Sequence, residues 1–253
     1  MKIWFKKAAL TTACLLYLGG VQAADIVLDP GHGGKDPGAI GNLGKHRLYE
    51  KDIALDISLQ MRKHLKQQGF SVAMTRSSDV FHPLKKRLAY ARKHCRKLFA
   101  SVHVNSAKNK KANGVQTYVS RQAHQSEVGR KSLKIAQNVQ KAFNPKSGVR
   151  RAGFMMLKNT DCPTVQLEMY YMSHTGDLKK LADKRQRHAI AGKLAKVLGK
   201  SLKAQAEKRK TVKAPPRKTR DKAAKAVVKK RKASDTRRPA RKHQGKHKNK
   251  RKK

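Results

Sequence analysis

The chain has 253 residues and a formal net charge of +47, with 62 Lys/Arg, 15 Asp/Glu and only 5% aromatic residues. This length indicates one full domain with additional segments. No apolar run reaches the roughly 20 residues that a spanning helix needs, which excludes a membrane-embedded mature chain. The charge is uneven, because residues 203–253 alone hold 24 Lys/Arg and three acids and so contribute +21.

The N-terminus has the pattern of a secretory signal peptide. Lysines precede the apolar run Ala8–Leu18, and the small-residue site Val21-Gln22-Ala23 follows it. This order predicts a signal peptide over residues 1–23, with cleavage after Ala23. A membrane anchor would need a longer run, and Cys14 lies inside the run rather than at a lipoprotein site. We therefore expect export across the inner membrane, to the periplasm or the cell envelope.

From Asp25 onward, strand-like and helix-like patterns alternate. Strands are expected where short apolar runs end at turn residues, over Asp25–Asp29, Phe70–Arg76, Leu98–Val104, Gly114–Ser120 and Thr164–Met169. Helices are expected where apolar residues recur every three or four positions, over Glu50–Gly69, Pro83–Cys95, Ser126–Phe143 and Leu178–Leu202. The alternation predicts a single α/β domain over residues 24–202, with a mainly parallel twisted sheet flanked by helices.

Residues 203–253 form a basic tail. It has almost no large apolar residues and no aromatic residue, so the sequence predicts a disordered polycation. Outside the cytoplasm its partners would be anionic envelope polymers or anionic lipid head groups, bound through counterion release. A solvated tail without a specific partner is the plainer alternative. Nucleic-acid binding is a rival function, but the signal peptide and the lack of stacking aromatics argue against it.

The cysteines leave two alternatives open. Cys14 is removed with the signal peptide, which leaves Cys95 and Cys162 in an oxidising compartment. They could form one disulfide. Two separate buried cysteines without a bond between them are at least as consistent with the sequence.

Four residues stand where an α/β sheet gathers functional groups. His32 follows the first strand, while His103 and Glu168 lie at the ends of later strands and Glu50 begins a helix. The carboxyl ends of parallel strands share one edge of a sheet, so these side chains could converge there. Two imidazoles and a carboxylate are the ligand set of hydrolytic zinc sites. A further carboxylate is then needed as general base.

Taken singly, these residues have plainer interpretations. His32 could be a loop histidine, His103 a core histidine, and Glu50 an acid favoured by the helix dipole. Glu168 needs a partner or a function, because it ends an apolar strand. The glycines at positions 31, 33 and 34 would let the backbone and a metal ion come close.

Several motifs occur together and in order: IVLDPGHGG, YEKDIALDIS, LKKRLAYARKH, LFASVHVNS and PTVQLEMYYMSH. On these, the region from Asp25 to Leu198 resembles the zinc-dependent N-acetylmuramoyl-L-alanine amidases of the bacterial cell wall, the amidase_3 family. The resemblance implies a peptidoglycan hydrolase that cuts the amide between N-acetylmuramic acid and L-alanine by zinc-activated water.

The resemblance also assigns roles to the matching residues. It implies one zinc ion per chain, bound by His32, Glu50 and His103, with Glu168 as the catalytic general base. Asn105 would position the substrate or order the loop after His103. The alternative function is a non-catalytic protein that binds the cell wall or another polyanion through its tail. The intact set of site residues argues against that alternative.

The chain departs from the family pattern in two places. Tyr170 and His174 replace a small residue and an asparagine near the catalytic glutamate, which puts the shape of the site's rim in question. Regulated relatives also carry a long insertion whose helix blocks the zinc. Here only Arg121–Lys131 separates the preceding strand from the next helix, so we predict that this autoinhibitory helix is lacking.

Overall fold

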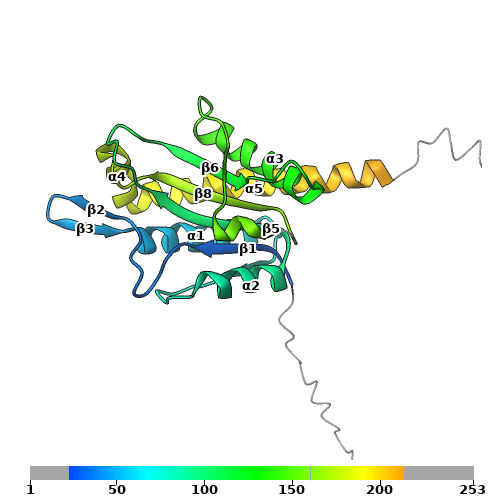
Figure 1. Ribbon diagram of the computed structural model, residues 1–253, viewed down its shortest axis with the longest axis horizontal. Coiled ribbons are helices and arrows are strands. Elements are labelled where there is room, and N and C mark those ends of the chain that lie inside the picture. The colour runs from blue at the N-terminus through cyan, green and yellow to red at the C-terminus, as the bar shows by residue number, and fades with distance from the viewer. Residues whose placement is uncertain (1–22, 160, 214–253) are drawn as a thin grey trace, which may run out of the picture. The chain divides into compact units, whose positions relative to one another are not determined.

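The computed structural model describes residues 23–159 and 161–213 (Figure 1). The predicted signal peptide, apart from Ala23, and the tail beyond Lys213 lie outside the described residues. Within the described ranges, no helix combines the length and the apolar character required to cross a membrane.

A six-stranded sheet forms the centre of the domain. Its strands, from edge to edge, are β4 (Val72–Met74), β1 (Ala24–Pro30), β5 (Cys95–Asn105), β8 (Thr164–Tyr171), β6 (Val115–Ser120) and β7 (Arg150–Ala152). The pairs β4–β1, β1–β5 and β5–β8 are parallel, whereas β6 runs antiparallel to β8 and parallel to β7. The prediction of a mainly parallel α/β sheet is therefore confirmed.

Two cores cover the two faces of the sheet. The larger core packs one face against α1 (Glu50–Gln67), α3 (Glu127–Phe143), α4 (Thr175–Ala182) and α5 (Lys184–Lys213). The smaller core packs the other face against α2 (Leu84–His94) and the short 3₁₀ helix η1 (Met155–Lys158). Side chains alternate between the faces along β1, where Ile26 and Leu28 enter the larger core and Val27 the smaller. Figure 1 shows α2 and α5 on opposite sides of the sheet.

Some elements differ from the sequence prediction. The hairpin of β2 (Ile40–Leu43) and β3 (His46–Tyr49), the edge strand β7 and η1 were not predicted. The last predicted helix is two helices, because Asp183 takes an extended backbone conformation between α4 and α5.

The C-terminal boundary also differs. The prediction that helical structure ends at Leu202 is wrong, since α5 continues to Lys213. The extension consists largely of Lys, Ala, Gln and Glu, which are good helix formers. The compact unit that contains the sheet ends at Gln205.

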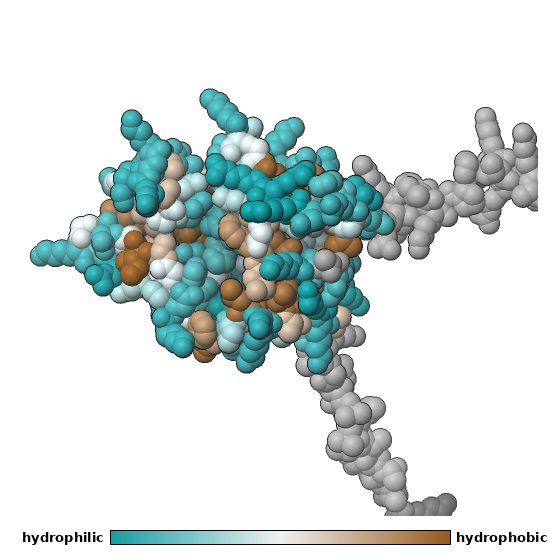
Figure 2. Space-filling model, in the orientation of Figure 1, coloured by the Kyte–Doolittle hydropathy of each residue, from teal (hydrophilic) through white to brown (hydrophobic). Residues whose placement is uncertain are grey.

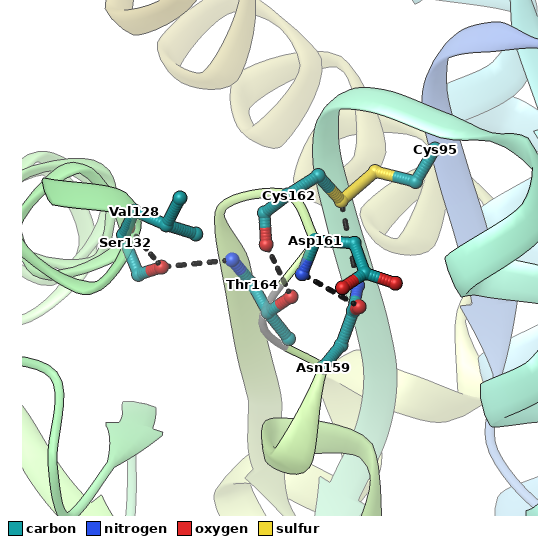
Figure 3. The surroundings of a disulfide bond; sticks show 7 residues. All are labelled: Cys95, Val128, Ser132, Asn159, Asp161, Cys162 and Thr164. Atoms are coloured by element: carbon teal, nitrogen blue, oxygen red, sulfur yellow. Dashed lines mark hydrogen bonds between the residues drawn. A yellow bond between two sulfur atoms is a disulfide. The ribbon is translucent and has the colours of Figure 1, made fainter. Parts of the chain in front are cut away.

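Cys95 and Cys162 are joined in a disulfide, with their Cα atoms 6.2 Å apart (Figure 3). The alternative of two separate buried cysteines is therefore wrong. Cys95 begins β5 directly after α2, and Cys162 lies between η1 and β8. Nearby, Thr164 N donates to Ser132 Oγ on α3 over 2.8 Å. The disulfide thus ties the connection that carries η1 to the start of a central strand.

Candidate metal centre

Three predicted site residues converge at the carboxyl ends of β1 and β5. His32 follows the Pro30-Gly31 turn that ends β1, and His103 lies near the end of β5, the parallel neighbour of β1. Glu50 is the first residue of α1. One ligand atom from each of the three residues lies within 4.8 Å of the other two.

Glu50 stands between the two imidazoles. Its Oε1 atom is 3.2 Å from His32 Nε2 and 2.9 Å from His103 Nδ1. Four ligands at about 2.0–2.1 Å around a tetrahedral zinc ion lie roughly 3.3 Å from one another. These separations therefore fit ligand atoms that share one ion. Val104 N and Ala39 N donate to Oε1 and Oε2 over 3.0 Å and 2.8 Å, which fixes the carboxylate.

The charges in the site are tightly coupled. Burial opposes ionisation of Glu50, but hydrogen bonds from His103 and His32 outweigh it and hold the pKa of this carboxyl well below its usual range. Burial likewise opposes charging of the two histidines, and the carboxylate of Glu50 nevertheless raises the pKa of both imidazoles. The electrostatic environment of the site therefore favours a group that carries positive charge.

Asp36 orients His32 from the other side of the ring. His32 Nδ1 donates to Asp36 Oδ2 over 2.9 Å, and Gly38 N donates to Asp36 Oδ1 over 3.1 Å. This bond fixes the orientation of the ring, with Nε2 3.2 Å from Glu50 Oε1. A carboxylate on the distal nitrogen is the usual support of a metal-binding histidine.

Two glycines allow the ligand groups to meet. A Cβ on Gly31 would lie 2.6 Å from His103 Nδ1, and a Cβ on Gly38 would lie 2.7 Å from both Glu50 Oε2 and His32 Cδ2. The sequence attributed this role to the glycines at 31, 33 and 34. The interpretation is right for Gly31, but Gly33 and Gly34 have positive φ and pack against the backbone of residues 80–81.

Two arginines hold the loop that carries His32. Arg87 Nη1 donates to Pro30 O over 2.7 Å, and its Nη2 donates to His32 O. Arg76 Nη2 donates to Gly31 O over 2.7 Å. Three successive carbonyl groups of the turn are thus bonded to buried guanidinium groups. This bonding keeps His32 in place although its φ of 59° lies in the left-handed region.

Glu168 lies on β8, next to His103 in the β5–β8 ladder. Its side chain is buried, and Gln166 Nε2 donates to Glu168 Oε1 over 2.7 Å. Burial raises the pKa of Glu168, with a further contribution from Glu50, and the nearby His103 and Gln166 only partly oppose the rise. A buried carboxylate beside two imidazoles and a second carboxylate is suited to taking up a proton.

Comparison with known proteins identifies the family. A family model described as N-acetylmuramoyl-L-alanine amidase matches residues 26–200. The chain belongs to this family. Among solved structures, the fold is similar to the catalytic domain of the amidase CwlV from Bacillus (Paenibacillus) polymyxa, with a TM-score of 0.60, 31% identity, and coverage of 72% of this chain and 97% of that one. The amidase AmiC2 of Nostoc punctiforme has a TM-score of 0.58 at 30% identity, covering 74% and 98%.

Sequence relatives differ in length. This amidase is 30% identical over 203 residues to the uncharacterized protein YqiI of Bacillus subtilis, covering 76% of this chain and 94% of YqiI. It is 33% identical to the probable cell wall amidase LytH of Staphylococcus saprophyticus, covering 65% of this chain and 54% of LytH. It is 36% identical over 143 residues to the amidase AmiC of Neisseria meningitidis, covering 56% of this chain and 34% of AmiC. The chain thus spans about half or less of these two named amidases.

The remaining sequence-predicted residues of this amidase have local partners. Asn105 Oδ1 accepts a hydrogen bond from Ser106 N over 2.9 Å, so its side chain orders the turn after β5. Tyr170 has a φ of 68°, at the irregularity that precedes the last pair of the β5–β8 ladder, Asn105 with Tyr171. His174 is the N-cap of α4, where its Nδ1 accepts from Asp177 N over 3.1 Å.

Sequence reasoning missed three residues of the centre: Asp36, Gly38 and Gln166. Asp36 lies four residues after His32 and Gln166 two residues before Glu168, so spacing along the chain was the available signal for both. Gly38 gave no signal, because its close neighbours, Glu50 and His32, come together only in the folded chain.

In the connection after β6, the strand ends at Ser120 and α3 begins at Glu127, and the intervening residues 121–126 form turns. All residues of this connection are described, and they form no helix before α3 begins.

A cavity of about 460 Å³ opens beside the candidate metal centre. Its polar part includes His32, Asp36, His103 and Gln166. This volume is within the range of small-molecule sites. The cavity gives a substrate access to both histidines.

Proposed function

We propose that this amidase hydrolyses the amide bond between N-acetylmuramic acid and L-alanine of the peptidoglycan stem peptide. The observation that carries the proposal is the convergence of His32, Glu50 and His103 beside Glu168, in a chain of the N-acetylmuramoyl-L-alanine amidase family. The alternative of a non-catalytic wall-binding protein gives no reason for these four groups to converge beside a cavity that His32 and His103 line.

We further propose that His32, Glu50 and His103 hold one zinc ion. Two imidazole nitrogens and one carboxylate oxygen are the donor set of catalytic zinc sites, which leave a fourth position open. The bond from His32 to Asp36 and the close approaches at Gly31 and Gly38 support the assignment. A bound zinc ion would polarise the substrate carbonyl and lower the pKa of a water molecule to about 7.

In this proposal, Glu168 carries the proton. Its carboxylate accepts a proton from the attacking water and delivers it to the alanine nitrogen as the amide bond breaks. Gln166 donates to Oε1, so Oε2 is the atom for this transfer. Burial raises the pKa of Glu168, and the protonated form is therefore more accessible than in an exposed glutamate. Asn105 remains a candidate for positioning substrate through the turn that it orders.

The test is cleavage of purified peptidoglycan by the chain beginning at Ala24. We expect released stem peptides with a free L-alanine amino group, loss of release on chelation, and recovery with zinc. No activator should be required, because the connection 121–126 carries no helix. Glu168→Gln should reduce kcat by 10²-fold or more, the usual contribution of a general base. Binding without any release would favour the non-catalytic alternative.

We also propose that the chain is exported and that its tail retains it in the envelope. The N-terminal pattern supports export, and N-terminal sequencing of the mature protein should begin at Ala24. The +21 charge of residues 203–253 supports binding to anionic envelope polymers. Removal of residues 214–253 should weaken binding to cell walls at low salt and leave it unchanged at high salt. Equal binding with and without the tail at low salt would contradict this role.

A further inference from the structure

One side of the cavity beside the metal centre is apolar and exposed. Phe81, Leu84, Phe154 and Met155 are among the residues that line this cavity. The exposed fractions of Phe81, Leu84 and Phe154 are 39%, 54% and 42%. We call these four residues the apolar wall. In Figure 2, brown hydrophobic patches interrupt the hydrophilic surface in the lower centre of the view, the region where α2 and η1 run in Figure 1.

Most of the strongly exposed large hydrophobic side chains of the described residues lie at the apolar wall. Among the described residues, the large hydrophobic side chains with the greatest exposure are Ile40, Val80, Phe81, Leu84 and Phe154. Three of these five residues line this single cavity, and a fourth directly precedes Phe81. Exposed apolar side chains that cluster beside a catalytic centre are typical of a ligand-binding surface.

The apolar wall is held in place by the fold. Leu157 N donates to Phe154 O over 3.1 Å in η1, and the Phe154 ring lies 5.3 Å from the ring of Tyr118 on β6. On the other side, Arg87 Nε donates to His82 O over 2.9 Å, which fixes the segment between Phe81 and Leu84. A preformed surface loses little entropy when a ligand binds.

The scissile amide has a sugar arm and a peptide arm, and they differ in charge. In the substrate, the carboxyl group of the muramoyl residue is part of the amide, so this arm is a neutral pyranose with apolar C–H faces. The peptide arm carries free carboxylates. Two acidic side chains line the cavity, Asp29, which is buried, and Asp36, which is 42% exposed, and both repel an anionic arm. Arg87 also lines the cavity, but its guanidinium is only 2% exposed and is already bonded to Asp29 and to backbone carbonyl groups. The flat phenyl rings of Phe81 and Phe154 fit the apolar C–H face of the neutral pyranose.

We infer that the apolar wall is the subsite for the pyranose ring of the muramoyl residue, with Phe154 as its main contact. This inference rests on the proposed function. Phe154 is the better aromatic platform, because Lys35 Nζ lies over the Phe81 ring, 5.1 Å from its centroid.

The test compares two soluble substrates that share one peptide. One is the N-acetylmuramoyl peptide, and the other is the D-lactoyl peptide, which has the same amide but lacks the pyranose. We expect Phe154→Ala to lower kcat/KM about tenfold for the muramoyl peptide, the size of one aromatic contact, and to leave the lactoyl peptide unaffected. Ile40→Ala is the matched control, since Ile40 is 46% exposed but lies outside the cavity. The Ile40→Ala variant should leave kcat/KM unchanged for both substrates.

Equal losses on both substrates, or no loss on either, would overturn the assignment. A second measurement tests the subsite without catalysis. It uses NMR to follow the binding of N-acetylmuramic acid methyl ester to the zinc-free protein. The ester should bind to the wild-type protein, and its affinity should fall about tenfold in Phe154→Ala. If neither substrate is cleaved but this difference holds, the proposed function fails and the subsite stands. Should Phe154→Ala not fold, Leu84→Ala takes its place.

Discussion

Replacing Asp36 tests the metal centre without touching any of its three candidate ligands. Asp36 accepts the Nδ1 proton of His32 over 2.9 Å, and this bond sets the ring nitrogen that faces Glu50. Asp36→Asn keeps an acceptor oxygen but removes the charge, whereas Asp36→Ala removes both. The pair of variants therefore separates the effect of the charge from that of the hydrogen bond.

The expected size of the effect follows from the contact. Removal of such a supporting partner usually weakens metal binding 10–100-fold, or about 1.4–2.7 kcal/mol. The carboxylate of Asp36 is 42% exposed, so solvent screens part of its charge. We therefore expect about a tenfold loss of zinc affinity for Asp36→Asn and nearer a hundredfold loss for Asp36→Ala.

The assay is competition for zinc between the protein and a chromophoric chelator at fixed pH. Glu127→Gln is the matched control, because Glu127 is an exposed carboxylate that pairs with Lys131 on α3, away from the centre. It should leave zinc affinity unchanged. Unchanged affinity in Asp36→Ala, with normal folding, would refute the view that His32 binds metal through Nε2 with support from Asp36.

Three further predictions concern stability, packing and pH. Replacing Cys95 and Cys162 together by serine should lower the free energy of unfolding by up to about 4 kcal/mol, measured by urea denaturation, because the disulfide closes a loop with a sequence separation of 67. Gly31→Ala should destabilise the fold by about 1–3 kcal/mol and abolish zinc binding, since its Cβ would displace the His103 ring. In the zinc-free protein, the pKa of Glu168, followed by NMR titration of its carboxyl group, should lie above the usual glutamate pKa of about 4.3, because burial raises it.

A specific result would contradict each of these three predictions. A serine double variant with an unchanged urea midpoint would show that the disulfide does not stabilise the fold. For the glycine, the control is Gly148→Ala, where a Cβ meets no atom within 4 Å, and equal effects of the two variants would contradict the contact argument. A Glu168 pKa at or below the ordinary glutamate value in the zinc-free protein would contradict the argument from burial.

Local sequence patterns predicted most of the fold. The apolar runs of β1, β5 and β8 and the helical spacing in α1 and α3 identified the elements, because each side chain reports the face that it buries. The β2–β3 hairpin was missed because its strands are short and largely exposed, so they carry no alternating pattern. The break at Asp183 was missed because the helical spacing continues on both sides of it.

The candidate site was predictable to a smaller degree. His32, Glu50, His103 and Glu168 were found from motifs at strand ends and from resemblance to a family. The supporting contacts depend on the folded chain, in which residues far apart in sequence meet. The disulfide likewise required the Cα distance, which no sequence pattern provides.

The central claim is that one zinc ion bound by His32, Glu50 and His103 is needed for amide cleavage. The most direct measurement is the zinc content of the purified mature chain together with its release of stem peptides. We predict one zinc per chain, loss of metal and activity together on chelation, recovery of both with zinc, and loss of both in His103→Ala. Full activity in metal-free protein, or in His103→Ala, would contradict the account.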